Sequence, residues 1–413
     1  MKFDTVIIGG GLAGLVCGIR LQQKGLKCAI VSAGQSALHF SSGSFDLLNE
    51  LPDGTAVTNP EEAVASLDKS HPYAKIGAKF ADYAKEAKQL LLASGVEVSG
   101  ESNRNVYRIT PMGTTMPTWL TLADFSTLKN SNDVLGKRIL LVNIAGFLDF
   151  NTKFVADAFE ANGAECRIKS VSLPEFERLR QSPTEMRSAN IARVIENKNT
   201  LNALLSTLKG DSNGFDVVAL PAVFGLSSLE PVKVLKDGLN IPVCLVPTMP
   251  PSVPGIRTQK QLRRVFEQAG GVYMLGDNVM KAETVNGRVE KVYTVNHGDI
   301  ALKADNFVLA TGSFFSNGLK AQMDRVYEPV FGADVDFDAN RNSWYSVSVF
   351  DPQKYRTFGV ATDEQFRIKV NGNVVDNVYA IGSVLSGFDA LQEGCGAGVS
   401  MLTALYVADN LKK

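Results

Sequence analysis

The chain has 413 residues, of which 45% are hydrophobic, and its formal net charge is −1. This length and hydrophobic content allow a large buried core and two domains, whereas the lack of a basic surplus argues against nucleic acid binding. No apolar run reaches about 18 residues and an apolar strand begins at the N-terminus, so we expect neither a transmembrane helix nor a signal peptide.

Residues 3–31 predict a strand, a glycine turn, a helix and a second strand. Residues 3–8 and 27–31 are apolar runs, and residues 12–24 have an apolar helical face. The G-x-G-x-x-G turn between them offers N–H groups and the positive end of a helix to a phosphate. The predicted phosphate contacts are Gly9, Gly11, Leu12, Ala13 and Gly14. The alternative is a structural glycine turn without a ligand.

The end of the second strand lacks an expected acidic residue. A dinucleotide-binding fold usually has Asp or Glu there, because a carboxylate holds the adenosine ribose. Here Ser32 follows the strand, and no carboxylate occurs before Asp46. This departure weakens the case for NAD and FAD and favours FMN, a flavin with a single phosphate. Ser32 stays among the predicted cofactor contacts, and FAD is the alternative cofactor.

Small and hydroxylated residues crowd the segment 35–46, QSALHFSSGSFD. We predict that Ser41, Ser42, Gly43 and Ser44 contact the phosphate or the polar atoms of a flavin. The alternative is a surface loop with local serine turns. His39, between two apolar residues, is a candidate for direct catalysis, and a packed histidine is the competing interpretation.

The middle of the chain predicts a second α/β unit. Helices are expected over residues 59–67 and 78–92, and short strands with turns over residues 106–120. Buried strands are then expected at residues 138–144, 166–171, 215–220 and 241–246, with helices between them and no phosphate glycine motif. The predicted fold class is therefore α/β: a Rossmann-type flavin-binding domain, formed by residues 1–100 and 255–413, with an inserted second α/β domain at residues 101–254.

Prolines in PTMPPSVP, residues 247–254, predict a rigid crossing back to the first domain, followed by a helix over residues 259–267. Arg257 lies just after this crossing, so it is a candidate for binding a substrate phosphate or the charge of a reduced flavin. A structural arginine that ties the domains together is the alternative. Arg187 and Arg193 are further candidates, for which an exposed helix face is the favoured interpretation.

In the C-terminal third, we expect two more kinds of segment to approach a cofactor. Strands at residues 305–310 and 378–381 end in small residues, and a glycine-rich segment opens a helix over residues 399–411. The five cysteines are widely spaced without a C-x-x-C pair, so no metal or iron–sulfur site is predicted. Redox chemistry at the cysteine among the glycines is a minor alternative. The predicted contacts in this third are Thr311, Gly312, Gly382, Ser383, Gly394, Cys395, Gly396 and Ala397.

Several segments together resemble the family formed by the B subunits of anaerobic glycerol-3-phosphate dehydrogenase. They are FDTVIIGGGLAGLVCGIRLQQKG, ALHFSSGSFDLL, PTMPPSVPGIR, VLATGSFFSNGL, YAIGSVLSGFD and EGCGAGV, which span almost the whole chain. The resemblance implies FMN and a complex with a larger, FAD-bearing catalytic subunit and an iron–sulfur subunit that docks at the cytoplasmic face of the inner membrane. It implies oxidation of glycerol 3-phosphate to dihydroxyacetone phosphate, with electrons passed towards quinone and on to fumarate or nitrate.

Two other functions stay open from the residues themselves. One is a self-sufficient flavin reductase or dehydrogenase of another small molecule, and the other is a non-catalytic nucleotide-binding or assembly protein. No triad or paired carboxylates stand out in the sequence, which suits a protein that relays electrons while its partner binds substrate.

Overall fold

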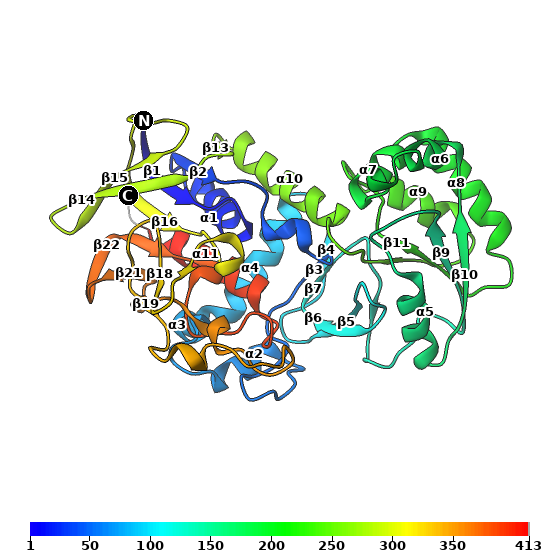
Figure 1. The fold of residues 1–413 in the computed structure, drawn as a ribbon, viewed down its shortest axis with the longest axis horizontal. Coiled ribbons are helices and arrows are strands. Elements are labelled where there is room, and N and C mark those ends of the chain that lie inside the picture. Colours follow the sequence, from blue (N-terminus) through cyan, green and yellow to red (C-terminus); the bar gives the residue numbers. More distant parts are fainter. Residues whose placement is uncertain (412–413) are drawn as a thin grey trace.

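The larger sheet is built around β1 (Lys2–Ile8), which pairs in parallel with β2 (Cys28–Ser32) on one side and β16 (Leu302–Leu309) on the other. The apolar side chains of β1 are almost completely buried. A parallel strand that is covered on both faces requires such a continuous apolar run. The computed structural model describes residues 1–411, and in Figure 1 this sheet lies in the larger lobe at the left.

Five further strands complete this eight-stranded sheet. β13 (Val272–Leu275) extends it beyond β2, and β22 (Asn373–Ala380) pairs in parallel with the C-terminal half of β16. The antiparallel strands at the edges are β14 (Val279–Val285), β15 (Arg288–Thr294) and β21 (Arg367–Val370). Asn286 and Gly287 form the turn between β14 and β15, and both have positive φ, as a two-residue hairpin of this type requires.

Helices pack around this sheet and position its carboxyl edge. α1 (Leu12–Gln23) contacts both α10 (Val253–Gln268) and α11 (Gly396–Asn410), and α11 also contacts α4 (Phe80–Ala93). α11 is apolar on nearly all sides because other elements surround it. The shorter elements of this lobe are α2 (Pro60–Ala63), α3 (Pro72–Ile76), β17 (Lys320–Ala321), β18 (Val326–Tyr327), β19 (Val335–Asp336), β20 (Gly359–Val360), η1 (Ala37–Phe40), η2 (Val64–Ser66), η3 (Gly77–Lys79), η5 (Phe314–Ser316), η6 (Arg341–Ser343), η7 (Lys354–Thr357) and η8 (Gly382–Val384).

The smaller lobe, at the right of Figure 1, contains a four-stranded parallel sheet in the order β10-β9-β11-β12 with its own hydrophobic core. Its strands are β9 (Arg138–Ile144), β10 (Glu165–Val171), β11 (Val217–Pro221) and β12 (Val243–Val246). Its helices are α5 (Thr152–Ala161), α6 (Pro174–Arg180), α7 (Ser188–Ile195), α8 (Lys198–Asp211) and α9 (Glu230–Gly238), with the short η4 (Pro183–Glu185).

Two small three-stranded sheets lie between these lobes, with the strand orders β3-β7-β4 and β6-β5-β8. Trp119 and Leu120 pack in the core of the larger lobe, whereas Ile109 packs in the core of the smaller one. The expected domain boundaries after residues 100 and 254 stay predictions. The strands are β3 (Ser44–Phe45), β4 (Val98–Ser99), β5 (Val106–Ile109), β6 (Thr115–Thr118), β7 (Leu120–Leu122) and β8 (Thr127–Leu128).

The structure corrects two helix boundaries. α10 begins at Val253, six residues before the expected start, because the Oγ of Ser252 accepts the N–H of Gly255 and Pro254 lies in the first turn, where its missing N–H costs nothing. Arg257 is therefore inside a helix. The helix expected over residues 59–67 is the four-residue α2, which continues as η2.

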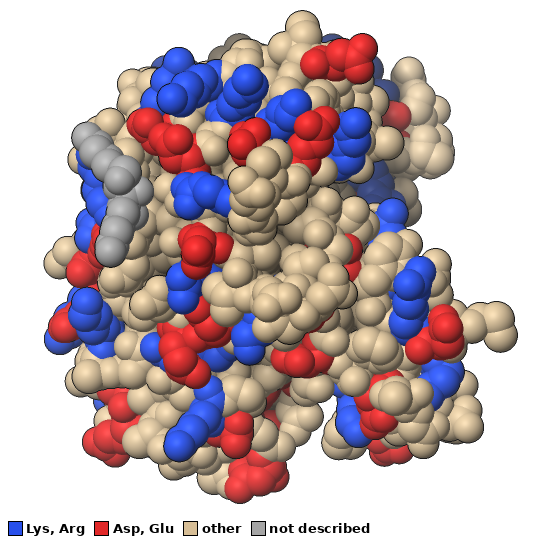
Figure 2. Space-filling model, turned by 90° about the vertical axis from the view of Figure 1, so that its left-hand side faces the viewer, with Lys and Arg blue, Asp and Glu red and all other residues tan. Residues whose placement is uncertain are grey.

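The surface agrees with the small net charge. Figure 2 shows Lys and Arg interspersed with Asp and Glu over one face, without a large region of one sign. Within residues 1–411, no helix combines the length and the apolar character needed to cross a membrane.

Candidate functional site

The glycine turn after β1 brings three chain segments close together. Gly9 has a φ of +117°, and a Cβ there would lie 2.1 Å from the carbonyl oxygen of Ala310. A Cβ on Gly14 would lie 1.9 Å from the carbonyl oxygen of Gly9. These two glycines therefore allow β1, α1 and the end of β16 to approach closely, in line with their expected roles.

Gly11 has a different function in the turn. Its φ is −82°, so the backbone does not require glycine. A Cβ there would meet no neighbour nearer than the Cβ of Ser36, at 3.7 Å. Gly11 thus keeps space in front of the first N–H groups of α1, to which Leu12 and Ala13 belong. Such a space would suit the predicted phosphate, and the contacts of these residues with a phosphate stay a prediction.

Ser32 is buried at the end of β2, where its Oγ donates to the carbonyl oxygen of Gly34. The backbone of Asp277 lies beside Ser32, because the N–H of Asp277 donates to the carbonyl oxygen of Ser32. The Asp277 carboxylate is occupied by the N–H groups of Asn278 and Asn296 and by His297. The carboxylate of Asp277 therefore already has partners and does not replace the acidic residue expected at Ser32.

The serine segment forms mainly local contacts. The Oγ of Ser41 accepts the N–H of Gly43, which has a φ of +84°, and Ser44 begins β3. Ser41, Ser42 and Ser44 are half-buried. Serine turns of this kind match the alternative interpretation, and contacts from these residues to a flavin stay a prediction.

His39 lies in η1, half-buried, and its carbonyl oxygen accepts the N–H of Ser252 before α10. Burial lowers the pKa of His39, and the nearby Lys260 lowers it further. The backbone of His39 thus joins η1 to the start of α10, and the catalytic role of its imidazole stays a prediction.

The expected C-terminal contacts converge on the glycine turn. A Cβ on Gly382 would lie 2.9 Å from the Cβ of Ala13, and a Cβ on Gly312 would lie 3.9 Å from the Oγ of Ser383. Both glycines have positive φ. The Oγ1 of Thr311 is buried without a hydrogen-bond partner among the described residues. Segments from three distant parts of the chain therefore meet at the carboxyl edge of the larger sheet, which is where ligands of open α/β sheets bind.

The start of α11 completes this edge. Gly394 has positive φ, Cys395 precedes the helix, and Gly396 and Ala397 form its first turn. Cys395 is fully buried, and burial raises the pKa of its thiol well above the usual value. A protonated, inaccessible thiol is a poor redox centre, so the geometry disfavours that alternative.

A cluster of His71, Glu393 and Cys395 beside α11 has the composition of a metal site, with one ligand atom from each residue within 4.8 Å of the others. The Nδ1 of His71 accepts the N–H of Tyr73, and its Nε2 lies 3.1 Å from a carboxylate oxygen of Glu393. The other oxygen of Glu393 accepts the N–H of Asp389. Because both imidazole nitrogens and both carboxylate oxygens already have partners, this cluster is a closed hydrogen-bond network.

Arg257 is 3% exposed and its guanidinium is paired with Asp124, which is 1% exposed. One nitrogen donates to both carboxylate oxygens of Asp124, and another donates to the carbonyl oxygens of Phe224 and Gly225. These contacts join α10 to loops of the inserted region and fit the structural alternative. The catalytic role of Arg257 stays a prediction. Arg193 is exposed on α7, as favoured from the sequence, whereas Arg187 is the exposed N-cap of α7 and pairs with the buried carboxylate of Asp149.

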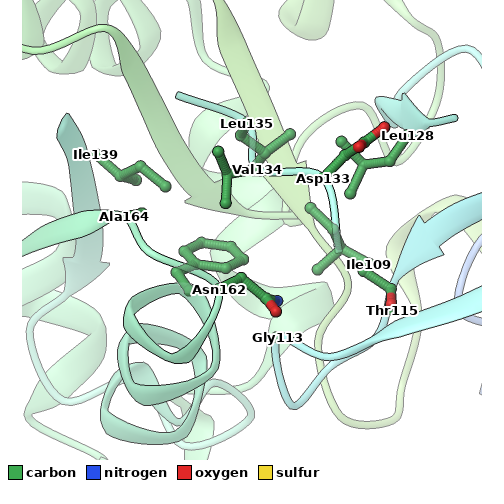
Figure 3. Close-up of a pocket in the computed structure, with 11 residues that line it drawn as sticks. Ile109, Gly113, Thr115, Leu128, Asp133, Val134, Leu135, Ile139, Asn162 and Ala164 are labelled. Carbon is green, nitrogen blue, oxygen red and sulfur yellow. The ribbon is translucent and has the colours of Figure 1, made fainter. Parts of the chain in front are cut away.

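Two cavities lie in or beside the smaller lobe, away from this edge. The first, of about 10 Å³, is lined mainly by apolar side chains such as Ile109, Leu135 and Ile139 (Figure 3). That volume is about the size of one water molecule, so it cannot hold a substrate. The second, of about 420 Å³, is an open groove between α8, α9 and the loop at Ser227.

One pair of side chains beside the start of α11 was not predicted from the sequence. Asp46 follows β3, and its carbonyl oxygen accepts the N–H of Gly398. The Oδ2 of Asp46 lies 3.8 Å from the guanidinium of Arg108 in β5. Asp46 ends the segment 35–46, which was singled out for its serines, but nothing in the sequence connects it with Arg108, which lies far away along the chain, so only the tertiary structure reveals the pair.

Comparisons with known sequences agree with this architecture. Residues 4–399 match the family model described as FAD binding domain. Over its full length, the chain is 45% identical to the B subunit of anaerobic glycerol-3-phosphate dehydrogenase from Yersinia enterocolitica, of which it covers 98%. It is 46% identical over its full length to the protein of the same name from Pectobacterium atrosepticum, of which it covers 99%.

Comparison with solved structures finds more distant likenesses. The 3-ketosteroid delta1-dehydrogenase of Sterolibacterium denitrificans matches over 99% of both chains, with 11% identity and a TM-score of 0.43. E. coli quinol fumarate reductase matches 99% of this chain and 69% of its own, with 10% identity and a TM-score of 0.45.

The predicted Rossmann-type α/β fold is confirmed by the family match and by the parallel sheet with its glycine turn. The cofactor expectation is refined, because the matched family is one of FAD binding domains and so favours FAD over the FMN that Ser32 suggested. With full-length identities of 45% and 46% to its relatives, the chain belongs to the B-subunit family of anaerobic glycerol-3-phosphate dehydrogenase.

Proposed function

We propose that this chain is a flavin-bearing subunit of a respiratory complex that oxidises glycerol 3-phosphate to dihydroxyacetone phosphate. The observation that carries the proposal is the full-length identity to the B-subunit relatives, whose name states this dehydrogenase activity. The convergence of the glycine turn, the loop at Gly312 and the start of α11 on one sheet edge supports it.

The residues at this edge fit a flavin. Gly11 keeps space in front of the first N–H groups of α1, which suits a phosphate. The N-terminus of α11 brings its positive end to the same region, which suits the carbonyl edge of a reduced flavin. When bound, a flavin supplies the hydride acceptor for alcohol oxidation. The chain contributes binding and orientation through these backbone groups.

We propose FAD as the flavin, and FMN is the alternative. The family match supports FAD, whereas Ser32, which lacks a carboxylate for the ribose, supports FMN. A ribose can also be held by backbone groups or by a side chain from another segment, so the missing carboxylate does not outweigh the family match.

The proposed partners are an FAD-bearing catalytic subunit and an iron–sulfur subunit, the second of which would hold the complex at the cytoplasmic face of the inner membrane. Electrons would pass towards quinone, with fumarate or nitrate as terminal acceptors. The designation of the relatives as B subunits supports a multi-subunit complex. Exposed apolar side chains in residues 345–350 also support it, since Val347 is 100% exposed and Phe350 95% exposed. Soluble monomers rarely expose contiguous apolar surface of this kind.

One set of measurements tests the proposal against its two rivals. We expect the purified chain to have a flavin absorption spectrum and to release one FAD on denaturation, as identified by chromatography. We expect glycerol 3-phosphate to reduce a dye only when the partner subunits are co-expressed. Turnover by the chain alone would favour a self-sufficient dehydrogenase. A colourless protein that takes up no flavin would favour a nucleotide-binding or assembly protein.

A further inference from the structure

Arg108 is a buried arginine with an unsatisfied donor. It is 8% exposed, and one nitrogen of its guanidinium contacts the Sδ of Met116, at 4.0 Å. Its Nε has no partner, and the nearest carboxylate oxygen, on Asp46, lies 3.8 Å away. A guanidinium offers five N–H donors, and buried donors are nearly always satisfied. Arg257 follows that rule through Asp124 and two carbonyl oxygens, whereas the unsatisfied Nε of Arg108 is a candidate for binding a ligand.

Unpartnered acceptors lie beside this donor. The Oδ1 of Asp46 and the Oδ1 of Asn49 are both buried without a hydrogen-bond partner among the described residues. The amide nitrogen of Asn49 donates to the carbonyl oxygen of Pro117, which fixes the orientation that leaves its oxygen free. Pro117 lies on β6, opposite Tyr107, the neighbour of Arg108 on β5. Asp46, the carboxylate nearest to Arg108, and Asn49, three residues further along the same segment, therefore supply two unpartnered acceptor oxygens.

The junction adjoins the helix that we assign to the flavin. The carbonyl oxygen of Asp46 accepts the N–H of Gly398, and the N–H of Asn49 donates to the carbonyl oxygen of Glu393. A side chain on Gly394 would collide with Asn49. The side chain of Asp46 is 21% exposed, so part of it faces solvent. In Figure 1, β5 and β6 lie between the two lobes, below β3 and β7.

We propose that Arg108, Asp46 and Asn49 form a binding site for a small ligand that carries both an oxyanion and a hydroxyl group. The guanidinium fork matches the oxygens of a phosphate or carboxylate, and the positive end of α11 favours the same charge. The free oxygens of Asp46 and Asn49 match a hydroxyl donor. Burial raises the pKa of Asp46, which Arg108 and two neighbouring hydroxyl groups partly offset, and a protonated carboxyl there would oppose an anion less.

A structural ion pair explains the geometry less well. A buried pair is stable only when good hydrogen bonds compensate for the lost hydration of both ions. The Arg257–Asp124 pair has such bonds, at 2.6 Å for the Oδ1 of Asp124, whereas Arg108 and Asp46 are separated by more than a hydrogen-bond length. The inference rests on the proposed function only for the choice of glycerol 3-phosphate as a probe.

Titration calorimetry on the flavin-loaded full chain tests the site with glycerol 3-phosphate, inorganic phosphate and glycerol. We expect the wild type to bind glycerol 3-phosphate more tightly than phosphate, and glycerol weakest. Arg108→Gln should weaken binding of both anions by roughly ten- to a hundred-fold, as expected for lost hydrogen bonds to a charged group. Asp46→Asn should weaken glycerol 3-phosphate more than phosphate. Arg104→Gln is the matched control, since it removes the same charge from an exposed position nearby.

Flavin content, measured first, separates this inference from the proposed function. A wild-type chain that binds flavin but none of the anions refutes the site and leaves the proposed function intact. Loss of flavin from a folded Arg108→Gln chain assigns Arg108 to the cofactor and also refutes the site. If Arg108→Gln does not fold, Arg108→Lys, which keeps the charge without the planar fork, should bind anions with intermediate affinity. Wild-type affinity in Arg108→Lys would then overturn the role of the fork.

Discussion

Removing the guanidinium of Arg257 should reduce stability more than turnover. The change Arg257→Ala leaves the carboxylate of Asp124, which is 1% exposed, without its counter-ion. It also leaves the carbonyl oxygens of Phe224 and Gly225 without this donor. Breaking a buried pair by removing one partner costs about 3–5 kcal/mol. This is a large share of the free energy of unfolding of a typical domain, about 5–15 kcal/mol.

The assay compares the thermal midpoint of the flavin-loaded chain with the turnover of the assembled complex. We expect a clearly lowered midpoint for Arg257→Ala and near-normal turnover at a temperature where the variant is folded. The double variant Arg257→Met, Asp124→Leu is the control, because it removes both charges and should recover much of the midpoint. A normal midpoint with turnover reduced ten- to a hundred-fold, roughly the effect of losing about 1.5–3 kcal/mol in the transition state, would refute the structural role and establish the catalytic one.

Four further predictions concern the glycine turn, His39 and Cys395. Gly11→Val should yield a folded chain without flavin, because the new side chain fills the space before α1, and flavin absorbance measures this. Gly14→Ala should lower the thermal midpoint, because its Cβ would lie 1.9 Å from a backbone oxygen, and melting curves measure this. His39 has a lowered pKa in the folded chain, so it disfavours folding as pH falls through its unfolded pKa of about 6.5. His39→Gln should therefore lose less stability than the wild type between pH 7 and pH 5 in denaturant titrations. Cys395, with its pKa raised by burial, should resist alkylation at pH 8 until the chain unfolds, as measured by mass spectrometry.

Each of these predictions has a contrary outcome, which for Gly14→Ala is an unchanged thermal midpoint. Full flavin content in folded Gly11→Val would remove the phosphate from this turn. An identical pH dependence in His39→Gln would mean that His39 does not contribute to it. Rapid alkylation of Cys395 in the folded chain would contradict its burial and restore the redox alternative, and Cys166, which is half-buried, is the internal control for reagent access.

Local patterns in the sequence were enough to predict the glycine turn and the strands that flank it. The apolar runs of β1, β2 and β16 and the G-x-G-x-x-G spacing can be recognised without the fold, because a strand or a turn is specified by residues a few positions apart. The same locality explains the error at α10, where four prolines concealed the helix start at Val253 that Ser252 caps. The comparison of FAD with FMN also depended on one local residue, Ser32, and the family match outweighed it.

The side chains that are free to bind a ligand could be identified only after the distant segments were placed. Arg257 and Arg108 both appear in the sequence as isolated arginines, but one meets Asp124 across 133 positions and the other lies near Asp46 without a hydrogen bond to it. The partners of His71 and Glu393 are likewise set by a contact over 322 positions. Whether a buried donor is satisfied depends on which distant segments pack around it, and this information exists only once the chain has folded.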